Sequence, residues 1–382
     1  MIDSKDELGT RILAWYGRRG RQLPWRRTRD PYRIWVSEIM LQQTRVSFAL
    51  SYYERFLQAF PTVQHLAGAR LAAVLKQWEG LGYYARARNL HRAARLIIRE
   101  HGGIIPPKMD SLLSLPGVGK STAGAILSLG YGAAAPILDG NVQRVLCRLT
   151  AIREDPKQAR VSRLLWQLAE GILPLRRPDR FNQGLMDIGA LVCTPRKPRC
   201  QICPLRPHCE AARLGIQEEI PPSQANPPLP RRERAVALIF RDEKVLLRRR
   251  PLQGLLGGLW EFPSGWVEDG VSPSCWLSAM LKQRYRLSVS LEREMLSFSH
   301  GYTHFQEVVR VFPGRCKGGK RVASRNLRWV PPQSLKEFPL SASHRRIARI
   351  VGEWTAKKQE QEQQGDRKPR KRRSHESLAT EE

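Results

Sequence analysis

The spacing of apolar and polar positions divides the chain into parts of different character. Up to residue 215, apolar residues recur at intervals of three and four, which places them on one face of a helix. Glycine and proline interrupt this pattern, and no stretch alternates cleanly as a strand would. We therefore predict an all-helical domain over residues 1–215. Its helical segments are expected at residues 33–60, 65–78, 85–101, 111–129, 141–150, 159–172 and 180–192.

The pattern changes after residues 216–232, a segment whose five prolines predict a stiff linker. Beyond it, apolar runs at 234–240 and 244–250 flank Asp242–Glu243 and predict two strands joined by a tight turn. The other expected elements are a helix at 272–285 and strands at 286–298, 303–313 and 321–330. We predict a second domain of mixed α+β type over residues 233–352.

The last segment, residues 353–382, is rich in glutamine and charged residues and has almost no large apolar side chains. Such a composition buries too little apolar surface to offset the entropy lost on ordering. We therefore expect a disordered, charged tail after the second domain. Hydrophobic residues make up 41% of the whole chain, so cores of ordinary size can form in both domains.

The chain carries a large excess of positive charge, with 65 Lys and Arg against 35 Asp and Glu and a net charge of +30. Residues 365–382 hold six basic and four acidic side chains, so nearly all of the excess lies elsewhere. A solubilising surface is one explanation of this charge. A polyanionic partner is favoured, because neutralising phosphates releases counterions and drives association.

No apolar run reaches the ~18 residues that a membrane span requires, and the beginning of the chain has early acids instead of a long apolar stretch. We expect a soluble protein of the cytoplasm with no membrane contact. Seven cysteines in such a chain indicate metal binding or a reactive thiol before disulfides.

Four of the cysteines lie within residues 193–209 with the spacing C-x6-C-x2-C-x5-C, at Cys193, Cys200, Cys203 and Cys209. Thiolates are the usual ligands of iron–sulfur clusters. A zinc site, which usually pairs two CxxC motifs, and buried free cysteines are the alternatives, but only one CxxC is present. We predict a [4Fe–4S] cluster. The spacing resembles that of the endonuclease III and MutY family, whose cluster holds a basic loop against DNA. The other cysteines, Cys147, Cys275 and Cys316, are expected to be packing residues.

A glycine-rich stretch, residues 115–119, lies inside the helical segment at 111–129. Gly117 and Gly119 permit a tight turn between helices and expose N–H groups that can bind a phosphate, although an ordinary loop is the alternative. Asp139 follows twenty residues after Gly119, beyond a loop with glycine and proline. This arrangement resembles the helix-hairpin-helix–Gly/Pro–Asp signature of DNA glycosylases.

Asp139 has a chemical task in that signature. Cleavage of an N-glycosidic bond builds positive charge on the sugar, and a nearby carboxylate stabilises it or forms a transient adduct. A cap at the start of the helix that follows Asp139–Asn141 is the structural alternative, and both interpretations are compatible. The resemblance also includes Asn141 among the residues that contact DNA.

Residues 37–44, SEIMLQQT, closely resemble the hallmark of the adenine-specific branch of this family. Adenine leaves poorly unless it is protonated, so a general acid must reach the base, at N7. Glu38 on a largely apolar helix beside Trp35 and Met40 would be partly desolvated, which raises its pKa and keeps it protonated. A surface glutamate is the alternative interpretation.

The lyase branch of the family carries a nucleophilic lysine where this chain has Ser121, and Lys120 lies about 100° around the helix. The resemblance therefore implies a monofunctional enzyme that uses water. Some relatives carry a lysine at the position of Gln143 that forms incidental adducts with abasic sites, so little covalent trapping is expected.

Chemistry on a stacked base requires its extrusion into a pocket. By resemblance, Trp25 and Arg26 line that pocket, and Gln43 and Tyr83 enter or wedge the base stack near the oxidised guanine. For Tyr83 core packing is the alternative. The residues expected near the wedge are Leu41, Thr44 and Leu81.

Residues 234–350 resemble a Nudix-like domain, with Trp260–Gly265 at the start of the fold. Nudix hydrolysis needs paired acids for Mg²⁺, but the matching positions hold Val271, Ala279, Met280, Gln283 and Arg284. The resemblance to the C-terminal domain of adenine glycosylases instead implies a binding module for oxidised guanine. The resemblance points to a loop at Phe298-Ser299-His300, where the hydroxyl of Ser299 can meet the N7/O8 edge of the lesion, with an ordinary strand-end turn as the alternative.

Together with these features, the resemblance implies a monomeric, monofunctional adenine DNA glycosylase that binds duplex DNA at the nucleoid and acts on adenine opposite 8-oxoguanine or guanine. The predicted fold is multidomain, an all-α helix-hairpin-helix domain with a [4Fe–4S] loop followed by an α+β Nudix-like domain. Three rivals stay open at this point. They are a pyrimidine glycosylase/lyase, a lesion-binding protein without catalysis and a hydrolase of oxidised nucleotides.

Overall fold

The computed structural model describes residues 5–222, 228–318 and 326–365. The chain forms two compact units, Met1–Pro228 and Leu229–Glu382, so the division falls inside the predicted linker. No helix in the described ranges is long and apolar enough to cross a membrane.

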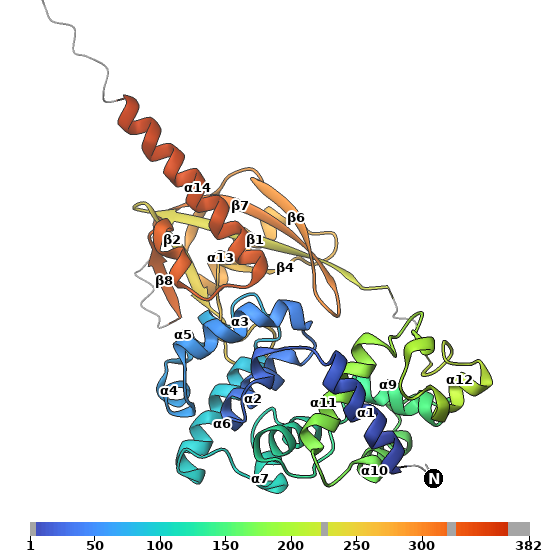
Figure 1. Cartoon of the computed structure of the whole chain (residues 1–382). Helices are drawn as coiled ribbons and strands as arrows, with labels where there is room; N and C mark the ends of the chain where they lie inside the picture. The colour runs from blue at the N-terminus through green and yellow to red at the C-terminus, as the bar shows by residue number, and fades with distance from the viewer. Residues whose placement is uncertain (1–4, 223–227, 319–325, 366–382) are drawn as a thin grey trace, which may run out of the picture. The chain divides into compact units, whose positions relative to one another are not determined.

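The first unit is helical throughout its described part (Figure 1). Its helices are α1 (Lys5–Arg19), α2 (Pro31–Leu41), α3 (Val46–Ala59), α4 (Val63–Gly68), α5 (Leu71–Gln77), α6 (Ala85–His101), α7 (Met109–Leu113), α8 (Lys120–Ala125), α9 (Gly140–Leu149), α10 (Ala159–Ile172), α11 (Pro178–Leu191) and α12 (Glu210–Leu214). A single π-turn, Ile126–Gly130, continues α8. The 3₁₀ turns are Pro24–Arg26, Cys200–Ile202 and Arg206–His208.

Two groups of helices make up this unit. Helix α1 packs against α11, and α9 packs against α10, α11 and α12 around one core that includes Ile12, Leu146 and Leu165. Helices α2 to α8 form the other group, in which α2 contacts α3, α6 and α8 and α4 contacts α6. Helix α11 also contacts the π-turn after α8, which joins the groups. The candidate site residues described below come from both groups.

The predicted helical segments are found, but three of them are divided. The segment 33–60 is broken by a turn after Leu41, the segment 65–78 is split into α4 and α5, and the segment 111–129 contains the hairpin between α7 and α8. Apolar residues recur on both sides of these turns because each flanking helix buries a face of its own. Helix α1 was not among the individually predicted segments.

The second unit is an eight-stranded mixed sheet whose main path runs β3-β2-β1-β7-β5. Its strands are β1 (Arg231–Arg241), β2 (Lys244–Arg249), β3 (Trp260–Glu261), β4 (Ser264–Trp266), β5 (Ser288–Leu291), β6 (Leu296–Gly301), β7 (Gln306–Gly318) and β8 (Leu327–Val330). Strands β1 and β7 are parallel, whereas β1–β2 is an antiparallel pair. The turn between them, Asp242–Glu243, has φ of 46° and 58°, as a tight hairpin requires.

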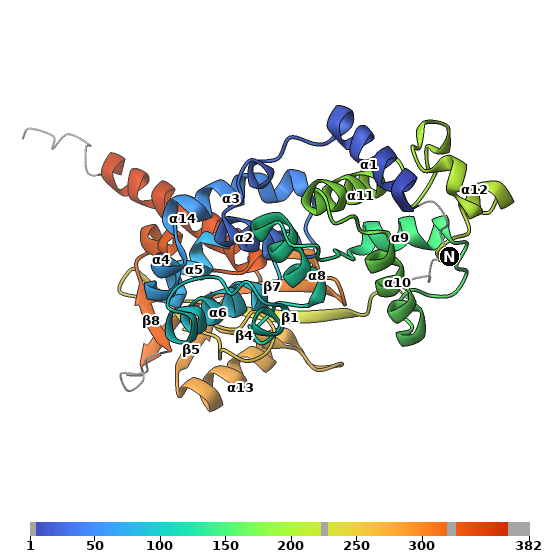
Figure 2. The ribbon, with the colours of Figure 1, turned by 60° about the horizontal axis from the view of Figure 1, so that its bottom comes forward.

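Alternation along β1 produces two cores, one on each face of the sheet, and Figure 2 shows a helix on either side of the strands. Ala235, Ala237 and Ile239 point to the face covered by α13 (Pro273–Tyr285). Val236 and Leu238 point to the face covered by α14 (Ala342–Gly365). This is the period-two pattern of a strand that is buried on both sides.

Two expectations for this part of the chain need correction. The disordered tail does not begin at residue 353, because α14 continues to Gly365. Val351 is buried and Trp354 packs on Phe240 with ring centroids 5.5 Å apart, which extends the helix past the predicted domain end. Residues 366–382 lie outside the described residues, as does part of the predicted strand 321–330.

Cys275 is exposed and is therefore no packing residue, whereas Cys147 is fully buried.

Candidate active site and cluster loop

The local sequence places Glu38 on the third turn of α2. Asp30 caps this helix by accepting a hydrogen bond from the backbone N of Tyr32 at 2.9 Å, and Pro31 fixes its first turn. The neighbours of Glu38 on the helix are almost all buried, and Trp35 and Met40 are 1% and 0% exposed. Glu38 therefore lies partly buried in an apolar setting.

Glu38 and Asp139 lie within electrostatic reach of each other, although they come from different helix groups. Burial raises the pKa of Glu38 to about 7, the negative charge of Asp139 acts in the same direction, and Arg26 opposes both. A carboxyl group with this pKa keeps a proton at neutral pH in a large fraction of molecules. The site thus combines a protonated acid with a second carboxylate.

Asp139 is the N-cap of α9, as the structural alternative anticipated. One carboxylate oxygen accepts from the backbone N of Val142 at 2.8 Å, and the other accepts from the side-chain amide of Asn141 at 3.0 Å. These two bonds fix the orientation of the carboxylate while it stays half-buried. Capping and charge stabilisation are therefore compatible in one residue.

Arg26 is held by a buried carboxylate that the sequence analysis did not single out. Asp187 on α11 is fully buried and accepts from Arg26 in a two-pronged pair at 2.6 and 2.8 Å, and from Arg21 at 2.6 Å. Burial would raise the pKa of Asp187, but the hydrogen bonds and charges of the two arginines lower it overall. Trp25, next to Arg26, is buried with its ring edge-on to Tyr53 at 5.2 Å. The sequence signal that could have identified Asp187 is an acidic residue inside a largely apolar helical segment.

The two expected wedge residues occupy turns with the same unusual backbone. Gln43 has φ of 57° and Tyr83 has φ of 48°, the left-handed region that non-glycine residues rarely enter. Gln43 is exposed and Tyr83 is 40% exposed. Leu81 is buried, whereas Leu41 and Thr44 are partly buried. Left-handed backbone at two exposed polar or aromatic side chains is typical of functional turns.

The turn between α7 and α8 requires glycine at one of its two glycine positions. Gly117 has φ of 82°, and an added Cβ would lie 2.9 Å from the Cβ of Asn89. Gly119 has an ordinary φ of −100°, and an added Cβ would meet nothing within 4 Å. Lys120 contacts the ring of Trp166 at 4.2 Å and the carboxylate of Glu170 at 3.1 Å, which ties it to α10. Ser121 is half-buried on the first turn of α8.

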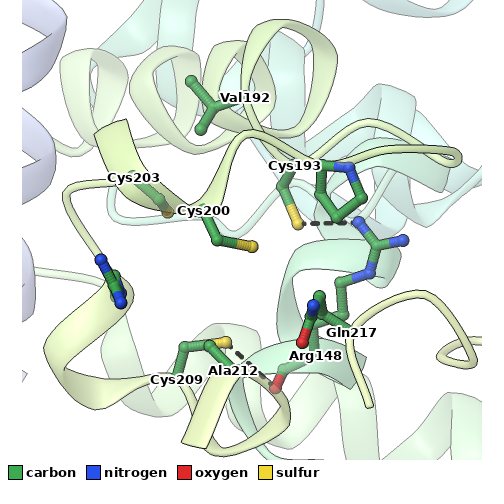
Figure 3. A pocket seen from close by; sticks show the side chains of 10 residues that line it. Arg148, Val192, Cys193, Cys200, Cys203, Cys209, Ala212 and Gln217 are labelled. Atoms are coloured by element: carbon green, nitrogen blue, oxygen red, sulfur yellow. Dashed lines mark hydrogen bonds between the residues drawn. The ribbon is translucent and has the colours of Figure 1, made fainter. Parts of the chain in front are cut away.

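The four predicted cysteine ligands line one pocket, with their sulfurs facing a common space (Figure 3). Burial raises the pKa of Cys203 to about 12 and also raises those of Cys200 and Cys209. No three His, Cys, Asp or Glu side chains of the described residues converge as a single metal ion requires. Four thiols that face one common space fit the ligand set of an iron–sulfur cluster.

Arg148 forms the wall of this pocket and was not anticipated from the sequence. It is 2% exposed, and its guanidinium donates to the sulfur of Cys193 at 3.3 Å and to the carbonyl oxygens of Thr194 and Ile220 at 2.7 Å each. The thiol of Cys209 donates to the carbonyl of Arg148 at 3.4 Å (Figure 3). The charge of Arg148 acts on the thiol of Cys200 against the burial that raises its pKa.

Arg144 connects the cluster loop with Asp139. Its Nε donates to the carbonyl of Cys193 at 2.7 Å, and its Nη2 donates to the side-chain oxygen of Asn141 at 2.9 Å. Asn141 in turn holds Asp139. The cluster loop therefore supports the first turn of α9, and through it the orientation of the carboxylate.

In the second unit, Ser299 and His300 lie within β6 and not in a loop, because the pairing with β7 continues to Gly301. Phe298 is buried on one face of the sheet, so alternation exposes Ser299 on the other. His300 packs edge-on to Tyr302 at 4.8 Å. Helix α13 carries Met280, Gln283 and Arg284 where metal-binding acids would be needed.

Family models match three segments of the chain. Residues 36–170 match the HhH-GPD superfamily of base excision DNA repair proteins, residues 193–209 match the iron-sulfur binding domain of endonuclease III, and residues 235–349 match the NUDIX domain. These matches confirm the predicted multidomain fold and the predicted iron–sulfur cofactor, a [4Fe–4S] cluster.

Several curated relatives are similar over most of their length. The adenine DNA glycosylase of Homo sapiens is 34% identical over 89% of this chain and 73% of its own. The adenine DNA glycosylase of Buchnera aphidicola subsp. Acyrthosiphon pisum is 37% identical over 77% of this chain and 82% of its own. Among solved structures, a thermostable thymine-DNA glycosylase is 31% identical with a TM-score of 0.51, covering 55% of this chain and 97% of that one.

Proposed function

Because the chain belongs to the adenine DNA glycosylase family of base excision repair, we propose that it removes adenine mispaired with 8-oxoguanine or guanine as a monofunctional hydrolase. The observation that carries the proposal is the pairing of Glu38, whose pKa is about 7, with the oriented carboxylate of Asp139. The fold brings them together from separate helices, α2 and α9. Core packing alone gives no reason for two carboxyl groups between these helices.

The proposed reaction assigns one role to each carboxyl group. Glu38 gives its proton to N7 of an extruded adenine, which makes the base a neutral leaving group. The bond between N9 and C1′ breaks, and the carboxylate of Asp139 stabilises the positive charge on the sugar. Water then adds to C1′ and releases a proton to the site, so that the balance is one adenine and one abasic sugar per water consumed.

The contacts of Lys120 do not support the Schiff-base chemistry of a lyase. Lys120, the lysine next to Ser121, is engaged by Trp166 and Glu170 on α10. These two contacts direct the amine of Lys120 towards α10. This observation favours hydrolysis by water over a Schiff-base mechanism.

The cluster takes no part in these steps. Cys193, Cys200, Cys203 and Cys209 would hold it, and its contribution is to fix the loop that supports α9 through Arg144. We place recognition of the oxidised guanine in the second unit, where Ser299 offers an exposed hydroxyl. The strongly basic chain suits a monomer that binds duplex DNA at the nucleoid.

The proposed function is tested by single-turnover base release from a duplex with one adenine opposite 8-oxoguanine. Duplexes with cytosine opposite 8-oxoguanine, and with thymine glycol, serve as controls. We expect strand breaks only at the adenine and only after alkali. Breaks at thymine glycol without alkali would assign the chain to the lyase branch, and tight binding without base release would make it a lesion-binding protein.

A further inference from the structure

Two turns of the first unit carry the residues expected to enter the base stack. One turn follows α2 and contains Gln43, and the other precedes α6 and contains Tyr83. Both residues adopt left-handed backbone, with φ of 57° and 48°. Such backbone persists only when surrounding contacts determine it, so something must hold the two turns.

One side chain, Arg86 on the first turn of α6, contacts both turns. Its Nη1 donates to the carbonyl oxygens of Ile39 and Met40 at 3.0 and 2.8 Å, and also to the carbonyl of Gln42. Its Nη2 donates to the hydroxyl of Thr44 at 3.1 Å. On the side of the second turn, Nη2 donates to the carbonyl oxygens of Leu81 and Gly82 at 3.3 Å each.

Aromatic rings complete the surroundings of this guanidinium. It lies 5.4 Å from the ring centroid of Trp78 and 5.4 Å from that of Tyr83. Arg86 is 9% exposed, and burial lowers its pKa to about 10, so the group stays charged at neutral pH. Arginine alone offers a flat fork of donors that can reach acceptors on two separate turns, since lysine concentrates three donors on one atom.

We propose that Arg86 is the positioning residue that couples the two wedge turns, so that Gln43 and Tyr83 enter the duplex as one unit. This inference rests on the proposed function, because it assigns Arg86 to base extrusion and not to bond cleavage. Arg86 fixes one turn through the carbonyl oxygens around Gln42 and the other through those of Leu81 and Gly82. A substitution at Arg86 separates extrusion of the base from the chemistry at Glu38.

The test measures extrusion directly by fluorescence. The full chain with Asp139→Asn, which keeps the base attached, is mixed with a duplex that carries 2-aminopurine opposite 8-oxoguanine. Unstacking of 2-aminopurine raises its fluorescence, and the rate is compared with that of the Asp139→Asn, Arg86→Lys double variant. We expect the unstacking rate to fall at least tenfold, whereas affinity for fully matched duplex changes less than twofold, because phosphate contacts remain.

The same substitution in the otherwise unaltered chain is tested for adenine release as a function of pH. We expect Arg86→Lys to slow release by a similar factor and to leave the midpoint near pH 7 unchanged, because Glu38 is untouched. Arg99→Lys, at the other end of the same helix and exposed, is the matched control and should unstack at the parent rate. Melting temperature and cluster absorbance establish that each variant is folded and loaded.

Each possible outcome supports or overturns the coupling. An unstacking rate of Arg86→Lys equal to that of the parent overturns the proposal, as does a smaller fluorescence amplitude at an unchanged rate, which means only fewer folded molecules. If Arg86→Lys does not fold, Thr44→Val removes one acceptor of the fork and Thr44→Ser retains it. Slower unstacking in Thr44→Val alone then supports the coupling, and equal rates overturn it. Absence of adenine release by the unaltered chain would instead remove the proposed function itself.

Discussion

At the scale of single residues, the proposed chemistry depends on a carboxyl group that keeps its proton near neutral pH. Burial and the charge of Asp139 raise the pKa of Glu38 to about 7. The rate of adenine release should therefore be constant below pH 7 and fall about tenfold per pH unit above it. Glu38→Gln, which cannot donate this proton, should lower the rate by about 10²- to 10⁴-fold. A rate for Glu38→Gln close to that of the unaltered chain would remove Glu38 as the acid.

The same raised pKa has a consequence for stability. The folded-state pKa of Glu38 lies above its unfolded value of 4.5. The contribution of this group to the free energy of unfolding is therefore fully present below pH 4.5 and is lost as the pH rises through 7. Glu38→Gln removes this penalty and should stabilise the protein by roughly 2 kcal/mol at pH 8, with a gain that shrinks towards pH 5. Urea unfolding at both pH values measures it. A gain that does not depend on pH would contradict the assigned pKa.

Asp187 is the residue whose loss should be most costly for the fold around the site. It neutralises Arg26 and Arg21 while fully buried. Asp187→Asn keeps the shape but leaves two arginines without their charge partner, so we expect a loss of about 3 kcal/mol in the free energy of unfolding. The exposed pair of Glu154 with Arg160 provides the control, and Glu154→Gln should change stability little. Equal effects of the two substitutions would contradict this role.

At the scale of elements, the hairpin between α7 and α8 depends on one glycine more than on the other. Gly117→Ala forces a side chain into φ of 82° and against Asn89, so we expect a loss of about 1–2 kcal/mol in stability. Gly119→Ala meets neither obstacle and should leave the free energy of unfolding nearly unchanged. Thermal melts of the two variants compare them directly. A larger loss for Gly119→Ala would show that the hairpin geometry differs from the one described.

At the scale of the whole molecule, the two units divide the proposed work between cleavage and lesion recognition. Ser299 lies on β6 of the second unit with its side chain exposed. Ser299→Ala should lower the ratio of release rates for adenine opposite 8-oxoguanine over adenine opposite guanine by about fivefold, the value of one hydrogen bond of ~1 kcal/mol. Single-turnover rates on the two duplexes give the ratio. Equal slowing on both duplexes would place the role of Ser299 in general binding.

The sequence by itself determined the local features of this protein. The period of apolar residues predicted the helices and strands, because an amphipathic element carries its pattern in neighbouring positions. The cysteine spacing and the Gly/Pro–Asp signature are local as well, so the cluster loop and Asp139 follow from the order of residues alone. The same patterns missed the ends of elements, such as the extension of α14 to Gly365 and the strand character of Ser299.

Only the tertiary structure decided which distant side chains meet. The charge of Asp139 acts on Glu38, which belongs to the other group of helices. Asp187 forms an ion pair with Arg26, which lies near the opposite end of the first unit's sequence. Arg86 forms hydrogen bonds with two separate turns. The partner of each residue cannot be read from its own segment, because an arginine or an acid among apolar positions has many possible partners. Its partner is set by how the helices pack, and packing depends on contacts between residues that are far apart in the chain.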